Sequence, residues 1–354
     1  GVEDDVSREA NRAAFREWSF VPRVLVNVAK RDLSTELFGR RYALPFGIAP
    51  MGICSITGYR GDLSLARAAA AEKALMIFSS SSLIRLEEVF AAAPAQPPWF
   101  QAYLPGDVAR IEALVERVAK AGYETLVLTV DVPVAANREN NVRAGFSTPL
   151  RPSLRLAWEG ITHPRWLFGT FLRTLVNHGM PHFENNYAER GAPMFSSQAV
   201  RDYSDRGHLT WEHLRLVRRQ WKGRLVVKGV LSVEDARLAR DEGADGLIVS
   251  NHGGRQLDTV IAPLRVLPEI VAAVPGLTVM LDSGVRRGTD VLKALALGAK
   301  YVFVGRPMNY ASALGGEAGV RRALQLLTAE VSVDMAMLGI TSLGQLSSAC
   351  LRKA

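Results

Sequence analysis

Residues 225–251 read LVVKGVLSVEDARLARDEGADGLIVSN. The stretch begins with a short apolar run at 225–229, continues with an amphipathic segment at 232–242, and ends with a second apolar run at 246–251. Gly243 follows the amphipathic segment, where a helix commonly ends on glycine. Two short apolar runs joined by a helical pattern predict a parallel βα unit.

The same pattern recurs along the chain from Pro45 onward. Further amphipathic segments include 61–73, 107–121 and 288–298. Eight candidate strands can be counted, at 45–50, 75–79, 99–103, 125–131, 225–229, 246–251, 278–283 and 301–305. Eight units predict a closed α/β TIM barrel, (β/α)8, because a doubly wound open sheet usually has fewer strands and a glycine-rich first turn.

We expect residues 1–354 to form a single barrel domain with one long insertion after the fourth strand. The inserted segment covers about 145–208 and ends before a helix expected to begin near Thr210. An insertion of this length in a compact barrel is either functional or disordered. Arginines and tryptophans are dense in 143–173 and 201–224, which suits an anionic membrane surface and equally a solvated basic face.

The composition is that of a globular protein, with 48% hydrophobic and 22% charged residues. The net charge of +8 raises the question of nucleic-acid binding, but the sequence contains no basic run interleaved with aromatic residues and no known nucleic-acid module. Cys54 and Cys350 have no metal-ligand spacing, so we expect no metal site and no disulfide framework, and a reducing compartment fits. No apolar run reaches the roughly 18 residues that span a bilayer, so we expect at most a peripheral membrane contact.

Polar residues and glycines gather at the carboxyl ends of the candidate strands, where TIM barrels build their active sites. One such residue alone is most simply a cap or a turn, but every strand contributes. The residues are Pro50, Met51, Gly52, Ser79, Ser80, Gln101, Tyr103, Thr129, Asp131, Lys228, Ser250, Asn251, His252, Asp282, Ser283, Gly284, Gly305 and Arg306. Glycines after strands seven and eight, with Arg286 and Arg306 beside them, predict a phosphate group and hence a phosphorylated cofactor.

Lys228 ends a barrel strand, and an unpaired ammonium is costly to bury. We therefore expect an anionic partner for Lys228. The lysine could form a Schiff base or lie beside a cofactor ring that gains negative charge, and the pattern does not separate the two.

His252 lies in a glycine loop at a strand end, which favours a catalytic base over a structural histidine. Arg255 follows three residues later, and Arg138 lies seven residues after Asp131. Two arginines near one pocket predict a carboxylate substrate. We interpret the remaining histidines as structural: His163, His178, His182, His208 and His213.

Two stretches resemble one known family. SNHGGRQLD at 250–258 and DSGVRRGTDV at 282–291 are similar to the signatures of the FMN-dependent 2-hydroxy acid oxidases and dehydrogenases, and the likeness covers essentially the whole chain. The resemblance implies that FMN is bound by Pro50, Met51, Gly52, Ser79, Gln101, Thr129, Lys228, Ser250, Asp282, Ser283, Gly284, Val285, Arg286, Gly305 and Arg306.

The resemblance also implies catalytic roles. His252 would be the base and Asp131 its charge partner, while Lys228 would stabilise negative charge on the cofactor. Tyr103, Arg138 and Arg255 would bind the hydroxyl and carboxylate of a small 2-hydroxy acid, giving an oxidoreductase that acts on CH–OH donors. A homo-oligomer, expected to be a tetramer, is implied in the same way.

Two positions depart from the family's pattern, and two others bear on which member of the family this is. The family's substrate-binding tyrosine, expected shortly before Gly1, is absent from the sequence, and Met51 replaces a usual threonine. Gly52 stands where many oxidases carry alanine, and Ser81 where glycolate oxidases carry a bulky tryptophan. We expect the missing side-chain volume at Gly52 and Ser81 to open space in the substrate site for a mandelate-like aromatic acid.

The inserted segment resembles the membrane-binding segment of the mandelate-oxidising members. We therefore expect a cytoplasmic enzyme on the inner face of the membrane that passes electrons to a quinone-type acceptor. The alternatives are a soluble oxidase that makes hydrogen peroxide, another class of FMN barrel, and a non-catalytic basic barrel that only binds membranes.

Overall fold

A computed structural model describes residues 1–146, 153–196 and 206–354. Its central sheet has eight parallel strands in the order β4-β11-β10-β9-β8-β7-β6-β5. The strands are β4 (Phe46–Ile48), β5 (Ile77–Ser79), β6 (Trp99–Ala102), β7 (Thr125–Thr129), β8 (Arg224–Val230), β9 (Gly246–Val249), β10 (Thr278–Leu281) and β11 (Val302–Val304). A parallel bridge between Ile48 and Met76 joins the first strand to the second, so the predicted TIM barrel is confirmed.

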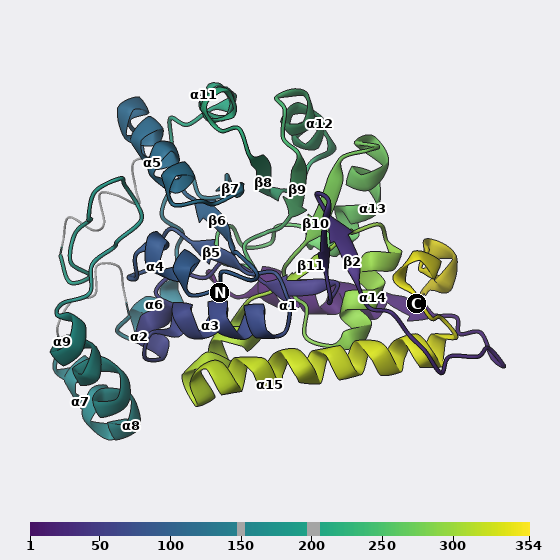
Figure 1. The fold of residues 1–354 in the computed structure, drawn as a ribbon, viewed down its shortest axis with the longest axis horizontal. Helices are drawn as coiled ribbons and strands as arrows, with labels where there is room; N and C mark the ends of the chain where they lie inside the picture. Colours follow the sequence, from purple (N-terminus) through teal and green to yellow (C-terminus); the bar gives the residue numbers. More distant parts are fainter. Residues whose placement is uncertain (147–152, 197–205) are drawn as a thin grey trace.

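A helix follows each strand and packs on the outside of the barrel (Figure 1). The helices are α3 (Gly61–Ala71), α4 (Leu86–Ala91), α5 (Val108–Lys120), α11 (Trp211–Gln220), α12 (Val233–Asp241), α13 (Pro263–Ala273), α14 (Gly288–Ala296) and α15 (Arg306–Leu338). The predicted segments coincide with these helices to within a few residues. Thr210 is the N-cap of α11, as the sequence predicts. The backbone of α15 leaves helical geometry at Gly315 and Gly316.

Several observed strands end earlier than the sequence predicts. The pattern places Asp131, Asn251 and Ser283 inside strands, whereas they lie in the loops that follow β7, β9 and β10. Ser283 has φ 80°, a left-handed conformation that no regular strand accommodates. The chain therefore leaves the sheet just where polar side chains are presented at the rim.

The other end of the barrel is closed by apolar side chains. A hairpin of β2 (Thr35–Leu37) and β3 (Arg40–Tyr42) contributes Leu37 and Tyr42 to a buried cluster with Trp99, Tyr301 and other residues of the barrel interior. Because Trp99 begins β6 and Tyr301 directly precedes β11, this cluster fills the amino-terminal end of the strands. The carboxyl ends remain as the place for a site.

The remaining elements lie outside the barrel. Strands β1 (Trp18–Phe20) and β12 (Leu351–Lys353) pair antiparallel, so residues 18–20 lie beside the C-terminal end of the chain. The short helices before the insertion are α1 (Val6–Ala13), η1 (Ala14–Glu17), α2 (Cys54–Thr57) and α6 (Glu139–Arg143), and near the end of the chain lie η3 (Leu343–Gln345) and η4 (Ser348–Cys350). None of the described helices has the length and apolar character needed to cross a bilayer.

The first described part of the insertion, up to His178, is helical and projects to one side of the barrel (Figure 1). It contains α7 (Leu154–Thr162), α8 (Pro164–Trp166), η2 (Leu167–Leu172) and α9 (Arg173–His178). The Trp166 indole donates to the carbonyl oxygen of Ile56 at 2.6 Å, and Asn185 caps α4 by accepting from Leu86 N at 2.8 Å. Parts of the predicted insertion, 147–152 and 197–205, lie outside the described residues.

Candidate active site

Three predicted site residues from different strand ends form one hydrogen-bonded chain. His252, after β9, places Nδ1 3.0 Å from Asp131 Oδ1 after β7. Its Nε2 lies 3.3 Å from the hydroxyl of Tyr103 after β6, and the two rings are nearly parallel. With the Nδ1 proton donated to Asp131, the lone pair of Nε2 faces the site, as a general base requires.

The carboxylate beside His252 is held in its charged form. Burial on its own raises the pKa of Asp131, but the neighbouring His252 and Lys228 outweigh it, so that the pKa lies below its ordinary value. An ionised Asp131 fixes the orientation of the imidazole and stabilises it when it gains a proton.

The backbone around His252 is unusual and firmly held. His252, Gly253 and Gly254 all have positive φ, of 58°, 70° and 70°. A Cβ on Gly254 would lie 2.6 Å from the backbone nitrogen of Arg8, so only glycine fits there. Asn251 and Asn11 donate to each other at 2.7 Å in both directions. Backbone strain of this kind persists where surrounding contacts compensate for it, and it is common at functional sites.

Among the described residues, no carboxylate forms an ion pair with Arg255. Burial and, to a smaller extent, the charge of Arg138 lower the pKa of Arg255 to about 10. In the part of the chain that the structure describes, no acidic side chain contributes to its pKa. Arg138 donates to the carbonyl oxygen of Arg255 at 3.1 Å and also bonds the side chain of Gln256. The two guanidinium groups suit an incoming carboxylate, because that of Arg255 has no acidic partner among the described residues.

Lys228 has the anionic partner that the sequence predicts. Its side chain is 4% exposed, and Nζ lies 3.1 Å from Asp282 Oδ2 and 2.9 Å from Ser250 Oγ. A lysine paired with a carboxylate is held as an ammonium ion, whereas a Schiff base requires the neutral amine. Of the two alternatives for Lys228, the pairing therefore favours a fixed positive charge beside a cofactor.

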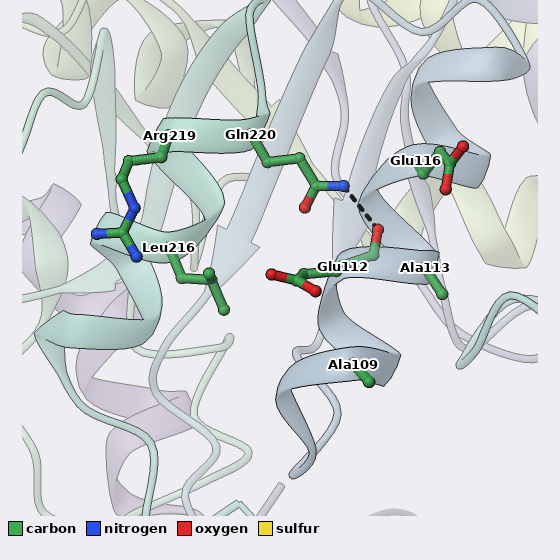
Figure 2. Close-up of a pocket in the computed structure, with 7 residues that line it drawn as sticks. All are labelled: Ala109, Glu112, Ala113, Glu116, Leu216, Arg219 and Gln220. Carbon is green, nitrogen blue, oxygen red and sulfur yellow. Dashed lines mark hydrogen bonds between the residues drawn. The ribbon is translucent and has the colours of Figure 1, made fainter.

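A groove of about 610 Å³ lies away from these strand ends, in the outer helix layer (Figure 2). It runs between α5 and α11, where Gln220 Nε2 donates to the carbonyl oxygen of Glu112 at 2.8 Å. None of the residues predicted for the site lines it. The groove is therefore separate from the candidate active site.

The sequence matches the FMN-dependent dehydrogenase family over residues 1–353. The chain belongs to this family. It is 38% identical to (S)-mandelate dehydrogenase of Pseudomonas putida over 98% of the chain and 86% of that protein. It is 41% identical to L-lactate dehydrogenase of Ectopseudomonas mendocina (strain ymp), over 94% of the chain and 86% of that protein. The crystal structure of the monotopic membrane protein (S)-mandelate dehydrogenase superposes with a TM-score of 0.90 at 38% identity, covering 100% of this chain and 93% of the other.

The buried polar atoms at the strand ends fit the flavin ring of this family's cofactor, FMN. In the described residues, Gln101 Nε2 and Thr129 Oγ1 are buried without a hydrogen-bond partner. Ser79 Oγ donates to Gln101 Oε1 at 2.9 Å, which leaves the amide nitrogen of Gln101 turned toward another acceptor. Unsatisfied buried donors are costly, so a polar ligand is expected to complete them.

The predicted phosphate site contains a cluster of arginines. Burial lowers the pKa of Arg286, and the charges of Arg306 and Arg12 lower it further. Burial also lowers the pKa of Arg306, whose guanidinium donates to the carbonyl oxygen of Gly253 at 2.7 Å. Cations that repel one another in a buried place fit a phosphate, which would relieve the repulsion.

The other predicted cofactor residues line the same rim. Ser283 Oγ accepts from Gly253 N at 3.0 Å and donates to Asp282 Oδ1 at 2.9 Å. A Cβ on Gly305 would lie 3.7 Å from Met51 Sδ. Of the remainder, Pro50 directly precedes Met51 after β4, Val285 is buried, and Gly284 has φ 88° and faces the backbone of Asn11. That these residues contact FMN stays a prediction.

Gly52 and Ser81 are steric neighbours. A Cβ on Gly52 would lie 2.8 Å from Ser81 Cβ, and Ile53 N donates to the carbonyl oxygen of Ser81 at 3.0 Å. The space beside Gly52 is thus occupied by Ser81 and is not open, contrary to the simplest interpretation of the missing side chain. The close approach of the loops after β4 and β5 supplies the reason for glycine at this position.

Three residues near the site were missed in the sequence, and the role of a fourth was not recognised. Asn11 and Arg12 reach it from the N-terminal helix α1, Asn251 is the buried partner of Asn11, and Arg206 lies over the ring of Tyr103 from the end of the insertion. Asn251 was noted only as a strand-end residue. No local pattern singles out the others, because each comes from outside the βα units.

Proposed function

We propose that this protein oxidises (S)-2-hydroxy acids with an aromatic side chain, of which mandelate is the model, to the 2-oxo acids. Electrons would pass to a quinone-type acceptor, and the enzyme would be a homotetramer at the inner face of the cytoplasmic membrane. The proposal rests on the two contacts of the His252 imidazole. Asp131 bonds its Nδ1, and the hydroxyl of Tyr103 lies beside its Nε2.

Each site residue has a role in the oxidation that follows from its chemistry. FMN, when bound, supplies the group that accepts two electrons from the substrate. His252 takes a proton at Nε2, and Asp131 stabilises the imidazolium that results. Arg255, assisted by Arg138, binds the carboxylate and so orients the reacting carbon, and the hydroxyl of Tyr103 bonds the substrate oxygen. Lys228 holds a fixed positive charge beside the cofactor.

Reduction of the protein's own flavin tests this function. The purified flavoprotein is mixed anaerobically with (S)-mandelate, (R)-mandelate, L-lactate and glycolate, and loss of flavin absorbance is followed. We expect rapid bleaching by (S)-mandelate and very slow bleaching by the R enantiomer. If no 2-hydroxy acid bleaches the flavin, the proposed function is wrong.

Re-oxidation then identifies the electron acceptor. The reduced protein is exposed to air or to a water-soluble quinone, and hydrogen peroxide is assayed. Rapid re-oxidation by the quinone with little peroxide supports a dehydrogenase. Stoichiometric peroxide would instead favour the soluble oxidase.

Ser81 is expected to set the size of the substrate. Its side chain is 8% exposed and lies against Gly52, so a tryptophan there would fill space at the rim of the site. We predict that kcat/KM of the wild-type protein is at least about tenfold higher for mandelate than for glycolate, and that Ser81→Trp reverses this preference. Ser81→Ala is the matched control and should keep it. A wild-type preference for glycolate would contradict the assignment.

The helices of the insertion support the membrane part of the proposal. They expose large apolar side chains together with basic ones, an arrangement typical of helices that lie in a membrane interface. The exposed apolar residues are Leu154, Trp158, Ile161, Phe168 and Val176, and the exposed basic residues of the same helices are Arg155, Arg165 and Arg173. Figure 1 shows α7, α8 and α9 grouped together, away from the barrel.

Replacing two of the exposed aromatic residues should weaken membrane binding. We expect Trp158→Ser with Phe168→Ser to reduce co-sedimentation with vesicles of anionic phospholipid by at least about tenfold, because each side chain would lose its burial in lipid. Leu314→Ser on α15, also highly exposed at 90%, is the matched control. Equal binding by all three proteins would contradict a membrane role for the insertion.

A further inference from the structure

Arg206 is a buried arginine that has no part in the mechanism proposed above. Its side chain is 5% exposed, although arginine is rarely buried to this extent in proteins. The guanidinium carbon lies 4.7 Å from the centre of the Tyr103 ring. Arg206 therefore brings a positive charge from the end of the insertion to the face of a predicted substrate-binding side chain.

The backbone that carries Arg206 is held by the turn that follows it. Leu209 N donates to the carbonyl oxygen of Arg206 at 3.1 Å, which closes a turn just before α11. His208 Nε2 lies 2.7 Å from the carbonyl oxygen of Gly106, in the loop after β6. Because the turn contacts the loop that follows Tyr103, the position of Arg206 over the ring is built into the fold.

Arg206 extends the chain of contacts at the site by one member. The order becomes Arg206, Tyr103, His252 and Asp131, in which the ring of Tyr103 contacts the cation and its hydroxyl contacts the imidazole. A cation over an aromatic face is attracted to the ring and polarises it. A phenol polarised in this way is a stronger hydrogen-bond donor to an oxygen that gains negative charge.

We propose that Arg206 is a positioning residue for oxidation of the 2-hydroxy acid, fixing the Tyr103 ring and strengthening hydrogen-bond donation by its hydroxyl. This inference rests on the proposed function. The stabilisation that Arg206 provides through Tyr103 should be larger in the transition state than in the ground state, because negative charge on the substrate oxygen develops as its proton leaves.

The test uses the purified flavoprotein and anaerobic reduction by (S)-mandelate. Arg206→Met removes the charge and keeps most of the side-chain length, and Arg206→Lys keeps the charge. We expect Arg206→Met to slow flavin reduction by about tenfold while the Kd of mandelate changes by less than about threefold. Arg206→Lys should recover part of the lost rate.

A double-mutant cycle separates this role from a merely structural one. When Tyr103→Phe has removed the hydroxyl, adding Arg206→Met should cause no further slowing, because the group through which Arg206 acts is gone. Arg110→Met is the matched control, since Arg110 lies over the ring of Tyr187 at 4.9 Å, and reduction should be normal. Wild-type rates in Arg206→Met, or equal slowing with and without the Tyr103 hydroxyl, would overturn the inference.

A second readout needs no substrate. Ultraviolet titration, compared between proteins with and without the Tyr103 hydroxyl, follows ionisation of this phenol alone. Arg206→Met should move the titration of Tyr103 to higher pH, because the cation that favours the phenolate is lost. An unchanged titration would contradict the role of Arg206 even if no 2-hydroxy acid reduced the flavin, so the two proposals can fail separately.

Discussion

His252→Ala is expected to keep its FMN and to lose flavin reduction by (S)-mandelate by a factor of roughly 10²–10⁴. The cofactor should stay because the buried donors predicted to bind it come from other residues, among them Gln101, Thr129 and Lys228. The rate should fall because no other described side chain occupies the place between Asp131 and Tyr103. Stopped-flow absorbance of the flavin measures both the cofactor content and the rate.

His213→Ala is the control for loss of a histidine. The imidazole of His213 lies 3.1 Å from the backbone nitrogen of Thr210, where it caps α11, and its described contacts involve none of the residues predicted for the site. We expect a slightly less stable protein with a normal reduction rate. Normal reduction in His252→Ala would show that His252 is not the base.

Arg255→Met is expected to weaken binding of the substrate's carboxylate by about 100-fold or more, since a charge-assisted pair in a partly buried place would be lost. Arg138→Met should have a smaller effect. The Arg138 guanidinium already donates to the carbonyl oxygen of Arg255, so part of its role is to support the loop. The measurement is the dependence of the flavin reduction rate on the concentration of (S)-mandelate.

Methyl mandelate provides a sharp control for Arg255. The ester has no carboxylate charge, so the wild type should bind it weakly and Arg255→Met should bind it no more weakly. The FMN content of Arg255→Met must be checked, because Arg255 also influences Arg306 in the predicted phosphate site. Equal losses of affinity for acid and ester would mean that Arg255 shapes the loop and does not bind the carboxylate.

The sequence predicts the barrel well because the signal is local. Each strand and helix carries its own periodicity, and counting the units leads to eight strands and a closed sheet. The rim residues follow from the same pattern, because the strand ends of a parallel barrel must meet on one face. That all of residues 1–354 form one domain stays a prediction.

The contacts within the site depended on the tertiary structure. The need of Lys228 for an anion follows from burial alone, but its partner is Asp282, which the family resemblance assigned to FMN binding. Gly52 appeared to open space, whereas Ser81 occupies it. Gly52 and Ser81 follow the neighbouring strands β4 and β5, whereas β9 lies between β8, which contains Lys228, and β10, which Asp282 follows. In both pairs the exact approach depends on tertiary packing, and no periodicity in the sequence specifies it.

The sequence by itself determined the architecture, the residues at the carboxyl-terminal rim of the barrel and the family. It could do so because each regular element has its own periodicity and short motifs stand at the ends of these elements. What only the tertiary structure decided was the arrangement around those motifs. Asn11 supports the histidine loop from the N-terminal helix, and Arg206 reaches Tyr103 from the end of the insertion. Both contacts join segments far apart in the chain, and only closure of the barrel and folding of the flanking segments against its rim bring them together.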